Sequence, residues 1–411
     1  MNTGDTAWVL TSAVLVLGMT IPGLAFFYGG LVRRKNVLSI LMQCFIIVCV
    51  ISLQWVLFGY SLAFGPDTGW GIIGSLKWAG LNFVGGQPNA DYAATIPHQA
   101  FMIFQAMFAV ITPALIIGAF AERMKFSAFL LFTLLWATLV YDPLAHWVWG
   151  TGGWLRNLGA LDFAGGIVVH VSSGVSALTL AILLGKRCGY DQQPFRPHNL
   201  PFTVLGAALL WFGWFGFNAG SALGANELAA NAFITTHIAA AAAGLTWALI
   251  EWRHRGAPTV LGAATGAVAG LVAITPACGF VNPMNAIFIG ILGSLLCYIA
   301  VVLIKCRLGY DDSLDAFGVH GVGGTWGTLA TGLFAEKAVN AAGADGLLFG
   351  NPRQLLVQFL LIVITPLFAA GMTWLIYKVV DGLVGMRVEK KDEIVGLDLT
   401  QQSESAYTVI E

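Results

Sequence analysis

The chain has 411 residues, of which 57% are hydrophobic and only 10% are charged, and its formal net charge is −1. Soluble domains carry about 25% charged residues, so this composition excludes an ordinary soluble globular protein and indicates a chain solvated mainly by lipid. The balanced charge also excludes the basic excess that nucleic-acid-binding domains carry.

Apolar runs of about 20 residues recur along the chain, and each is long enough to cross a bilayer as one helix. Eleven spans are predicted, at 6–32, 37–63, 98–121, 127–149, 162–185, 200–221, 230–252, 259–279, 284–306, 316–335 and 353–380. The first run lacks a basic leader and is too long for a signal peptide, so it is predicted to be a span. The predicted fold is an all-α polytopic membrane protein, with a transmembrane domain at 1–381 and a cytoplasmic tail at 382–411.

Lysine and arginine residues predict how these spans are oriented. Sixteen of the 20 fall on one side of the arrangement, and the other side keeps Lys77, Arg156, Lys337 and Arg353. Because basic residues are enriched in cytoplasmic loops, this split places the N-terminus outside and the C-terminus in the cytoplasm. The predicted location is the cytoplasmic (inner) membrane.

Two glycine-rich stretches place ionisable side chains at membrane depth. The first, at 162–174, contains His170, and the second, at 315–324, contains His320. Ionisable residues in spans usually face a cavity and mark a functional site, although a lone histidine is equally compatible with a bond to helix backbone. The matching surroundings in spans five and ten favour a site. They also predict an inverted repeat of spans 1–5 and 6–10, at about 1–190 and 200–340, with span 11 added.

The glycines predict that the two imidazoles meet. The pairs at 165–166 and 323–324 allow helix backbones to approach closely. His170 and His320 are therefore expected within hydrogen-bond reach near the midplane, in a lumen otherwise lined by apolar side chains. Asp162 stands at the first turn of span five, where an aspartate usually caps the helix and favours its N-terminus. Structural support is its predicted role, and a role in transport is the alternative.

Aromatic side chains form a further group of candidates. They are Phe104 and Phe108 in span three, Trp149 at the end of span four, and Trp214 and Phe217 in span six. Aromatic faces attract cations, although aromatic stripes in helical bundles more often serve as core packing. Ser221, at the end of span six, offers a hydroxyl that accepts a hydrogen bond from a small donor, or simply back-bonds to its own helix.

The motifs give no support to enzyme chemistry. The six cysteines form no C-x-x-C pair, and no H-x-x-x-H or H-x-x-H pair adds metal ligands to the two histidines. The sequence also has no P-loop and no G-x-S-x-G nucleophile elbow. The chain is therefore predicted not to be an enzyme and to need no metal or cofactor.

Five motifs carry a resemblance to a known family. They are PGLAFFYGGLVR at 22–33, DFAGG through the histidine at 162–170, GFNAGS at 216–221, TPACG at 275–279 and FGVHG at 317–321. Together they resemble the Amt/Rh/Mep ammonium transporters, and the bacterial Amt branch more than the Rh glycoproteins. The resemblance extends from Trp8 to about Tyr407, which is nearly the whole chain.

The resemblance implies an eleven-helix protomer with its own pore, assembled as a homotrimer, that carries ammonium or ammonia and takes methylammonium as an analogue. It assigns seven residues to the transport path. They are the outer recruitment site Phe108, Trp149 and Ser221, the gate Phe108 and Phe217, the pore pair His170 and His320, and the buried aspartate Asp162.

The tail carries a resemblance of its own, to the segment that docks a PII-type (GlnK-like) regulatory protein. The residues concerned are Gly396, Leu397 and Asp398, followed by 404–407, which end in Tyr407. Gln402 and Ser403 depart from the pattern, because a His-Gly pair is common there. Composition alone predicts a frayed, solvated tail instead.

Two other functions are weighed beside ammonium transport. The first is an ammonium sensor that signals through its cytoplasmic tail, and the second is a general small-solute pore. A receptor is expected to carry a further folded signalling domain, for which a tail of about 30 residues is too short. A general solute pore gives no reason for paired histidines. Transport is therefore the first hypothesis, and the sensor is the second.

Overall fold

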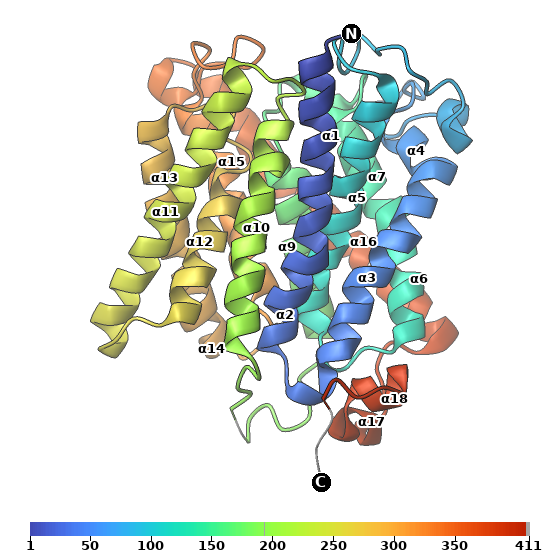
Figure 1. Ribbon diagram of the computed structural model, residues 1–411, viewed down its shortest axis with the longest axis vertical. Helices are drawn as coiled ribbons and strands as arrows, with labels where there is room; N and C mark the ends of the chain where they lie inside the picture. Colours follow the sequence, from blue (N-terminus) through green and yellow to red (C-terminus); the bar gives the residue numbers. More distant parts are fainter. Residues whose placement is uncertain (193, 408–411) are drawn as a thin grey trace.

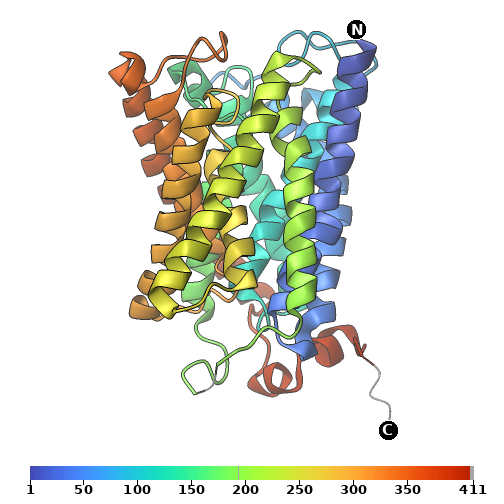
Figure 2. The same cartoon turned by 60° about the vertical axis from the view of Figure 1, so that its left-hand side comes forward.

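The computed structural model describes residues 1–192 and 194–407, and it shows a bundle of long helices that run between two opposite faces (Figures 1 and 2). The N-terminus lies at one face, and the terminal helices α17 (Lys390–Val395) and α18 (Leu397–Gln402) lie at the other. We call these the N-terminal face and the C-terminal face. The last four residues of the predicted tail, 408–411, lie outside the described residues.

The first five spans are built from one to four consecutive helical elements each. They are α1 (Thr3–Gly18), η1 (Met19–Leu24) and α2 (Ala25–Leu31); η2 (Arg34–Asn36), α3 (Val37–Gln54), η3 (Trp55–Gly59) and α4 (Tyr60–Phe64); α5 (His98–Phe120); α6 (Phe126–Trp136), η5 (Ala137–Tyr141) and α7 (Asp142–Trp149); and η6 (Gly166–Val171) and α9 (Ser172–Leu184). Two short helices, η4 (Leu76–Leu81) and α8 (Trp154–Leu158), lie in the connecting segments.

The remaining spans follow the same plan. They are α10 (Leu200–Gly220); α11 (Glu227–Arg255); α12 (Val260–Ile274); α13 (Pro283–Tyr298), η7 (Ile299–Ile304) and α14 (Lys305–Leu308); η8 (Phe317–Gly321) and α15 (Val322–Phe334); and α16 (Pro352–Val384). A short helix, η9 (Leu347–Phe349), precedes α16. The all-helical membrane fold predicted from the sequence is confirmed.

Two of the eleven spans differ from the simple apolar pattern. Nine of the helical stretches in the described part of the chain are long and apolar enough to cross a membrane; α12 and η8–α15 are not among them. α12 has 15 residues and ends before the predicted 279, because Pro276 has no N–H to continue the helix. Every residue from Phe317 to Phe334 is buried or half-buried, so the glycines and threonines of this span contact protein instead of lipid.

Spans five and ten cross at glycines. η6 packs against α15 and α9 packs against η8, as expected for two helices related by an inverted repeat. A Cβ on Gly174 would overlap the backbone of Gly321, and a Cβ on Gly324 would lie 2.9 Å from the Cβ of His170. Gly174 and Gly324 each follow their histidine by four residues, so each one makes room for the opposite stretch. The close approach therefore uses Gly324 as predicted, together with a Gly174–Gly321 contact that the sequence analysis did not identify.

Ion pairs join the loops at the C-terminal face. Glu122, between α5 and α6, binds Arg33 at 2.8 Å and Arg187 at 3.0 Å, and Arg187 binds Asp311 at 2.8 Å. Burial alone raises the pKa of Glu122, but the guanidinium groups of Arg187 and Arg33 outweigh it and hold this pKa below its ordinary value. These pairs connect the loops that follow spans one, three, five and nine.

The tail is docked on the C-terminal face, so the frayed tail that composition predicts is wrong for residues up to 407. The side chain of Asn36 accepts a hydrogen bond from the Leu397 N–H at 2.8 Å, and Asp398 accepts one from the Ser39 N–H at 2.8 Å. Gly396, which directly precedes Leu397, has φ +116°, and a Cβ there would lie 2.6 Å from the Lys35 carbonyl oxygen. Asp398 thereby caps the start of α3, which explains why a polar segment is ordered.

The close helix crossing predicts that one added methyl group at Gly174 is strongly destabilising. We expect Gly174→Ala to lower the folded yield and the melting temperature, with a loss of about 1–3 kcal/mol of stability from overpacking against backbone. Gly371→Ala in α16 is the matched control, since nothing lies within 4 Å of its added Cβ. Thermal unfolding in detergent measures both, and equal melting temperatures for the two variants would contradict the close crossing.

Candidate functional site

The two histidines meet inside the bundle. Nδ1 of His170 lies 3.2 Å from Nδ1 of His320, and the rings stack with centroids 5.2 Å apart and planes 18° from parallel. His170 is 1% exposed and His320 is 5% exposed. One Nδ1 therefore donates to the other, and the pair as a whole holds one proton between these two atoms.

A narrow apolar lumen contains this pair. Its volume is about 10 Å³, close to the space that one water molecule needs. Apart from the two histidines, its lining consists of apolar and aromatic side chains: Met19, Leu24, Phe27, Ile111, Leu115, Val169, Leu210, Trp214, Phe217 and Val268. Among the described residues, Nε2 of His170 has no hydrogen-bond partner although it is buried. When the shared proton is on Nδ1 of His170, this Nε2 is an acceptor, and a small solute that donates a hydrogen bond satisfies it.

Two stacked phenylalanines close the lumen toward the N-terminal face. The rings of Phe108 and Phe217 are 4.3 Å apart and 23° from parallel. Phe217 also lies 6.1 Å from the ring of His170. Both phenylalanines are almost completely buried, so a solute passes them only if a ring moves.

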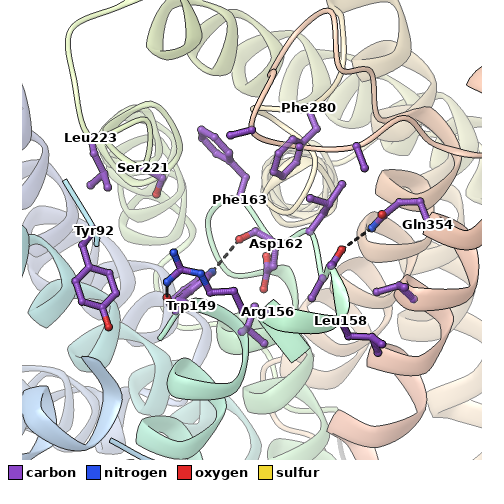
Figure 3. Close-up of a pocket in the computed structure, with 18 of the residues that line it drawn as sticks. Tyr92, Trp149, Arg156, Leu158, Asp162, Phe163, Ser221, Leu223, Phe280 and Gln354 are labelled. Atoms are coloured by element: carbon purple, nitrogen blue, oxygen red, sulfur yellow. Dashed lines mark hydrogen bonds between the residues drawn. The ribbon is translucent and has the colours of Figure 1, made fainter. Parts of the chain in front are cut away.

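A wide cavity of about 610 Å³ lies beyond the phenylalanine pair (Figure 3). Trp149 meets Phe108 edge to face at 5.9 Å, and its indole N–H donates to the Asp162 carbonyl at 2.8 Å, which fixes the ring. Ser221 also lines the cavity, and its hydroxyl donates to the Phe217 carbonyl at 2.9 Å. The hydroxyl oxygen keeps lone pairs for a donor from the cavity. We call this cavity the vestibule.

Asp162 acts on the backbone of its own stretch. Its carboxylate accepts hydrogen bonds from four successive N–H groups, those of Gly165, Gly166, Ile167 and Val168, at 2.6 to 3.2 Å. These are the free N–H groups at the start of η6, and a carboxylate there also stabilises the helix N-terminus. The side chain therefore holds the π-helical turn that carries His170.

The second histidine stretch has a capping aspartate of its own, which lies outside the predicted bounds of 315–324. Asp315, the first residue of that stretch, binds Lys305 at 2.6 Å. Asp312 takes the helix-start position and accepts the Phe317 N–H at 2.8 Å. Burial raises the pKa of this carboxyl to about 6. The missed signal was spacing, because both capping aspartates precede their histidine by eight residues.

A second cavity opens on the other side of the histidine pair. It has a volume of about 60 Å³ and shares His320 with the lumen. Its lining includes Tyr28, Thr265 and Asp315 toward the C-terminal face. The vestibule, the phenylalanine pair, the lumen and this cavity follow one another through the bundle.

Comparison with known proteins identifies the family. The model of the Ammonium Transporter Family matches residues 7–407. The chain belongs to this family. An ammonium transporter from Bacillus subtilis is 56% identical over 407 residues, which cover 99% of each chain. The crystal structure of Saccharomyces cerevisiae Mep2 is similar with a TM-score of 0.90 and 36% identity, over 95% of this chain and 89% of that one.

One solved structure bears on the alternative function. A structure named "Sensor Amt Protein" has a TM-score of 0.88 and 30% identity, and the match covers 97% of this chain and 98% of that one. The ammonium transporter fold therefore occurs in a protein named a sensor. The much higher identity to the Bacillus subtilis relative places this family member nearer to the proteins named transporters.

The Asp162 geometry predicts a difference between two substitutions. Asp162→Ala leaves four buried N–H groups without their acceptor, at about 1–3 kcal/mol for each group that stays unsatisfied. We expect a sharp fall in folded yield. Asp162→Asn keeps one acceptor oxygen and should fold better.

Yield and melting temperature in detergent measure this, with Asp91→Ala as the control because Asp91 is an exposed aspartate near the same cavity. Equal stability of Asp162→Ala and the parent would contradict the capping role. A well-folded Asp162→Asn variant without transport would instead assign the carboxylate a role in transport.

Proposed function

We propose that this family member is a multi-pass membrane protein that transports ammonium through a pore in its own helix bundle. The observation that carries the proposal is the sequence of vestibule, stacked phenylalanines and histidine pair along one path. The curated relatives at 48–56% identity are named ammonium transporters, which supports transport over the sensor function. The protein is accordingly a transporter and not an enzyme.

The vestibule is the proposed recruitment site. A cation beside the Trp149 and Phe108 rings gains cation–π attraction, worth about 2 kcal/mol where it is desolvated. Ser221 adds an acceptor oxygen. Ammonium donates an N–H hydrogen bond to this oxygen, whereas potassium has no hydrogen to donate. Recruitment therefore combines a contact that any cation makes with one that needs an N–H group.

The lumen is the proposed selectivity step. A bare ion that enters this narrow apolar space loses its hydration at a high cost, and potassium has no way to avoid that cost. Ammonium gives a proton to the open Nε2 of His170 as it passes the Phe108 and Phe217 rings, and it crosses the lumen as neutral ammonia. His170 and His320 then relay the proton, since each neutral imidazole offers one donor and one acceptor nitrogen. The distance of 3.2 Å between their Nδ1 atoms supports direct transfer.

Orientation and assembly are further parts of the proposal. The vestibule faces the outside and the C-terminal face lies in the cytoplasm, as the distribution of basic residues predicts. The membrane is the inner membrane, and the chain assembles as a homotrimer, as the family resemblance implies. Native mass spectrometry in detergent tests the assembly, and a purely monomeric protein would contradict it.

Reconstitution tests the function. We expect proteoliposomes with the protein to take up ammonium after a concentration jump, and to give no comparable response to potassium. Liposomes without protein are the control. Equal responses to both cations would contradict selective ammonium transport.

The histidine pair is tested in the same assay by recording current and uptake together. Replacing His170 and His320 both with Ala should stop the proton relay while neutral ammonia still permeates. Replacing one of them with Asp should admit potassium, because an anion in the lumen stabilises a whole cation. Full ammonium current with full selectivity in the double alanine variant would make the histidines purely structural.

The docked tail is the proposed binding site for a PII-type regulator at the C-terminal face. His198 Nε2 lies 2.9 Å from the Tyr407 hydroxyl, and Asp398 anchors α18. Gln402 and Ser403 close α18, and Ser403 has φ +57°. The anchored segment presents an ordered surface, as a docking partner requires.

We expect a PII-type protein to bind the reconstituted transporter and Asp398→Ala to weaken that binding at least tenfold by undocking the tail. Lys391→Ala, at an exposed residue of α17, is the control for charge on this face. The affinity of an immobilised PII-type protein is measured for the unmodified transporter, Asp398→Ala and Lys391→Ala. Absence of binding to the unmodified transporter would remove this partner from the proposal.

A further inference from the structure

The charges around the vestibule cancel. Four charged residues line it, namely Asp91, Arg156, Asp162 and Arg353. Two carboxylates and two guanidinium groups give a formal charge of zero at a site proposed to recruit a cation. A cavity that collected cations by long-range attraction would carry a net negative charge instead.

Arg156 lies close to the recruitment site (Figure 3). Its guanidinium donates to the Trp149 carbonyl at 2.7 Å, to the Thr151 hydroxyl at 3.2 Å and to the Asp91 carbonyl at 3.4 Å. It also faces the ring of Tyr92 at 5.9 Å. The carbonyl and hydroxyl partners fix the position of this side chain without neutralising it.

Among residues 1–192 and 194–407, no carboxylate forms an ion pair with Arg156. In the described part of the chain, none of the ion pairs involves Arg156 or Arg353. The carboxylate of Asp162 is bound by backbone N–H groups, and Asp91 offers Arg156 its backbone carbonyl. Both positive charges therefore act on the vestibule as separate charges.

A charge at this place acts equally on every monovalent cation. A unit charge about 8 Å from a cation in water changes its local occupancy roughly two- to threefold, and salt screens the effect over about 10 Å at 0.1 M. Such attraction would favour potassium or sodium as much as ammonium. The short contacts with Trp149, Phe108 and Ser221 set the choice between cations, and the charge sets how strongly the vestibule is occupied by all of them.

We propose that Arg156 sets the cation affinity of the vestibule, because its charge offsets the vestibule carboxylates and keeps ammonium and competing cations alike from accumulating there. This inference rests on the proposed transport of ammonium. Arg156 therefore lowers the apparent affinity for ammonium and the strength of potassium inhibition by the same factor, and the ratio of the two stays unchanged. The hydrogen bond to the Trp149 carbonyl holds the guanidinium beside the vestibule, and its positive charge produces the effect.

The test compares Arg156→Gln with Arg156→Lys by ammonium uptake into proteoliposomes at low salt. Arg156→Gln should lower the apparent KM for ammonium about two- to threefold and strengthen inhibition by potassium by the same factor. Both effects should disappear when about 0.5 M N-methylglucamine chloride screens the charge. Arg156→Lys keeps the charge and should match the parent in both measurements.

A charge cycle provides the matched controls. Asp91→Asn should shift KM and potassium inhibition in the opposite direction, and the double variant Asp91→Asn/Arg156→Gln should return close to the parent. Lys77→Gln removes an exposed positive charge in the segment between spans two and three, away from the vestibule lining, and should leave both values unchanged.

Three results would overturn the inference. They are an unchanged KM in Arg156→Gln at low salt, an equal shift in Lys77→Gln, and a loss of rate in both Arg156 variants that salt does not alter. The last result would leave Arg156 as a support for Trp149 only. Absence of uptake by the parent protein itself would instead contradict the proposed function, so the two failures are distinguishable.

Discussion

The close crossing of spans five and ten is the constraint on which the pore depends. Helix axes normally lie 8–10 Å apart because side chains separate them. At Gly174, Gly321 and Gly324 there is no side chain to do so, and the two backbones come into contact. At that separation the imidazoles of the two helices lie 3.2 Å apart. The glycines and the capping aspartates are therefore as much a part of the transport path as the rings that line it.

The environment also changes along the path, from a wide vestibule with charged residues in its lining to a narrow apolar lumen. The vestibule has a volume of about 610 Å³, whereas the lumen beyond the phenylalanine rings has about 10 Å³. A hydrated ion is accommodated in the first and stripped in the second, and this difference opposes the passage of any permanent charge. The cancelled charges at the vestibule complement this barrier, because they avoid enriching ions that the lumen then has to reject.

Much of this arrangement was predictable from the sequence. Apolar runs, basic residues at their ends and two similar histidine stretches suffice to predict the bundle, because each reflects a strong demand of the bilayer. The sequence analysis counted 316–335 among the apolar runs, whereas the helix at 317–334 is not among the nine stretches apolar enough to cross a membrane, since a helix buried among other helices need not be apolar. The sequence analysis did not identify Asp312, although Asp312 precedes its histidine by eight residues, as Asp162 does. The docking of Asp398 on α3 depends on contacts more than 350 residues apart, which no local pattern reveals.

The two halves of the central pair approach from opposite ends of the bundle. One histidine stands in a π-helical turn capped by Asp162, and the other in a π-helical turn capped by Asp312. The positive end of each helix and its carboxylate thus recur on both sides of the same two rings. A centre that looks alike from either side favours neither direction of passage. In the proposed pore, the direction of net flow is then set by the gradient across the membrane, and the flow reverses when that gradient reverses.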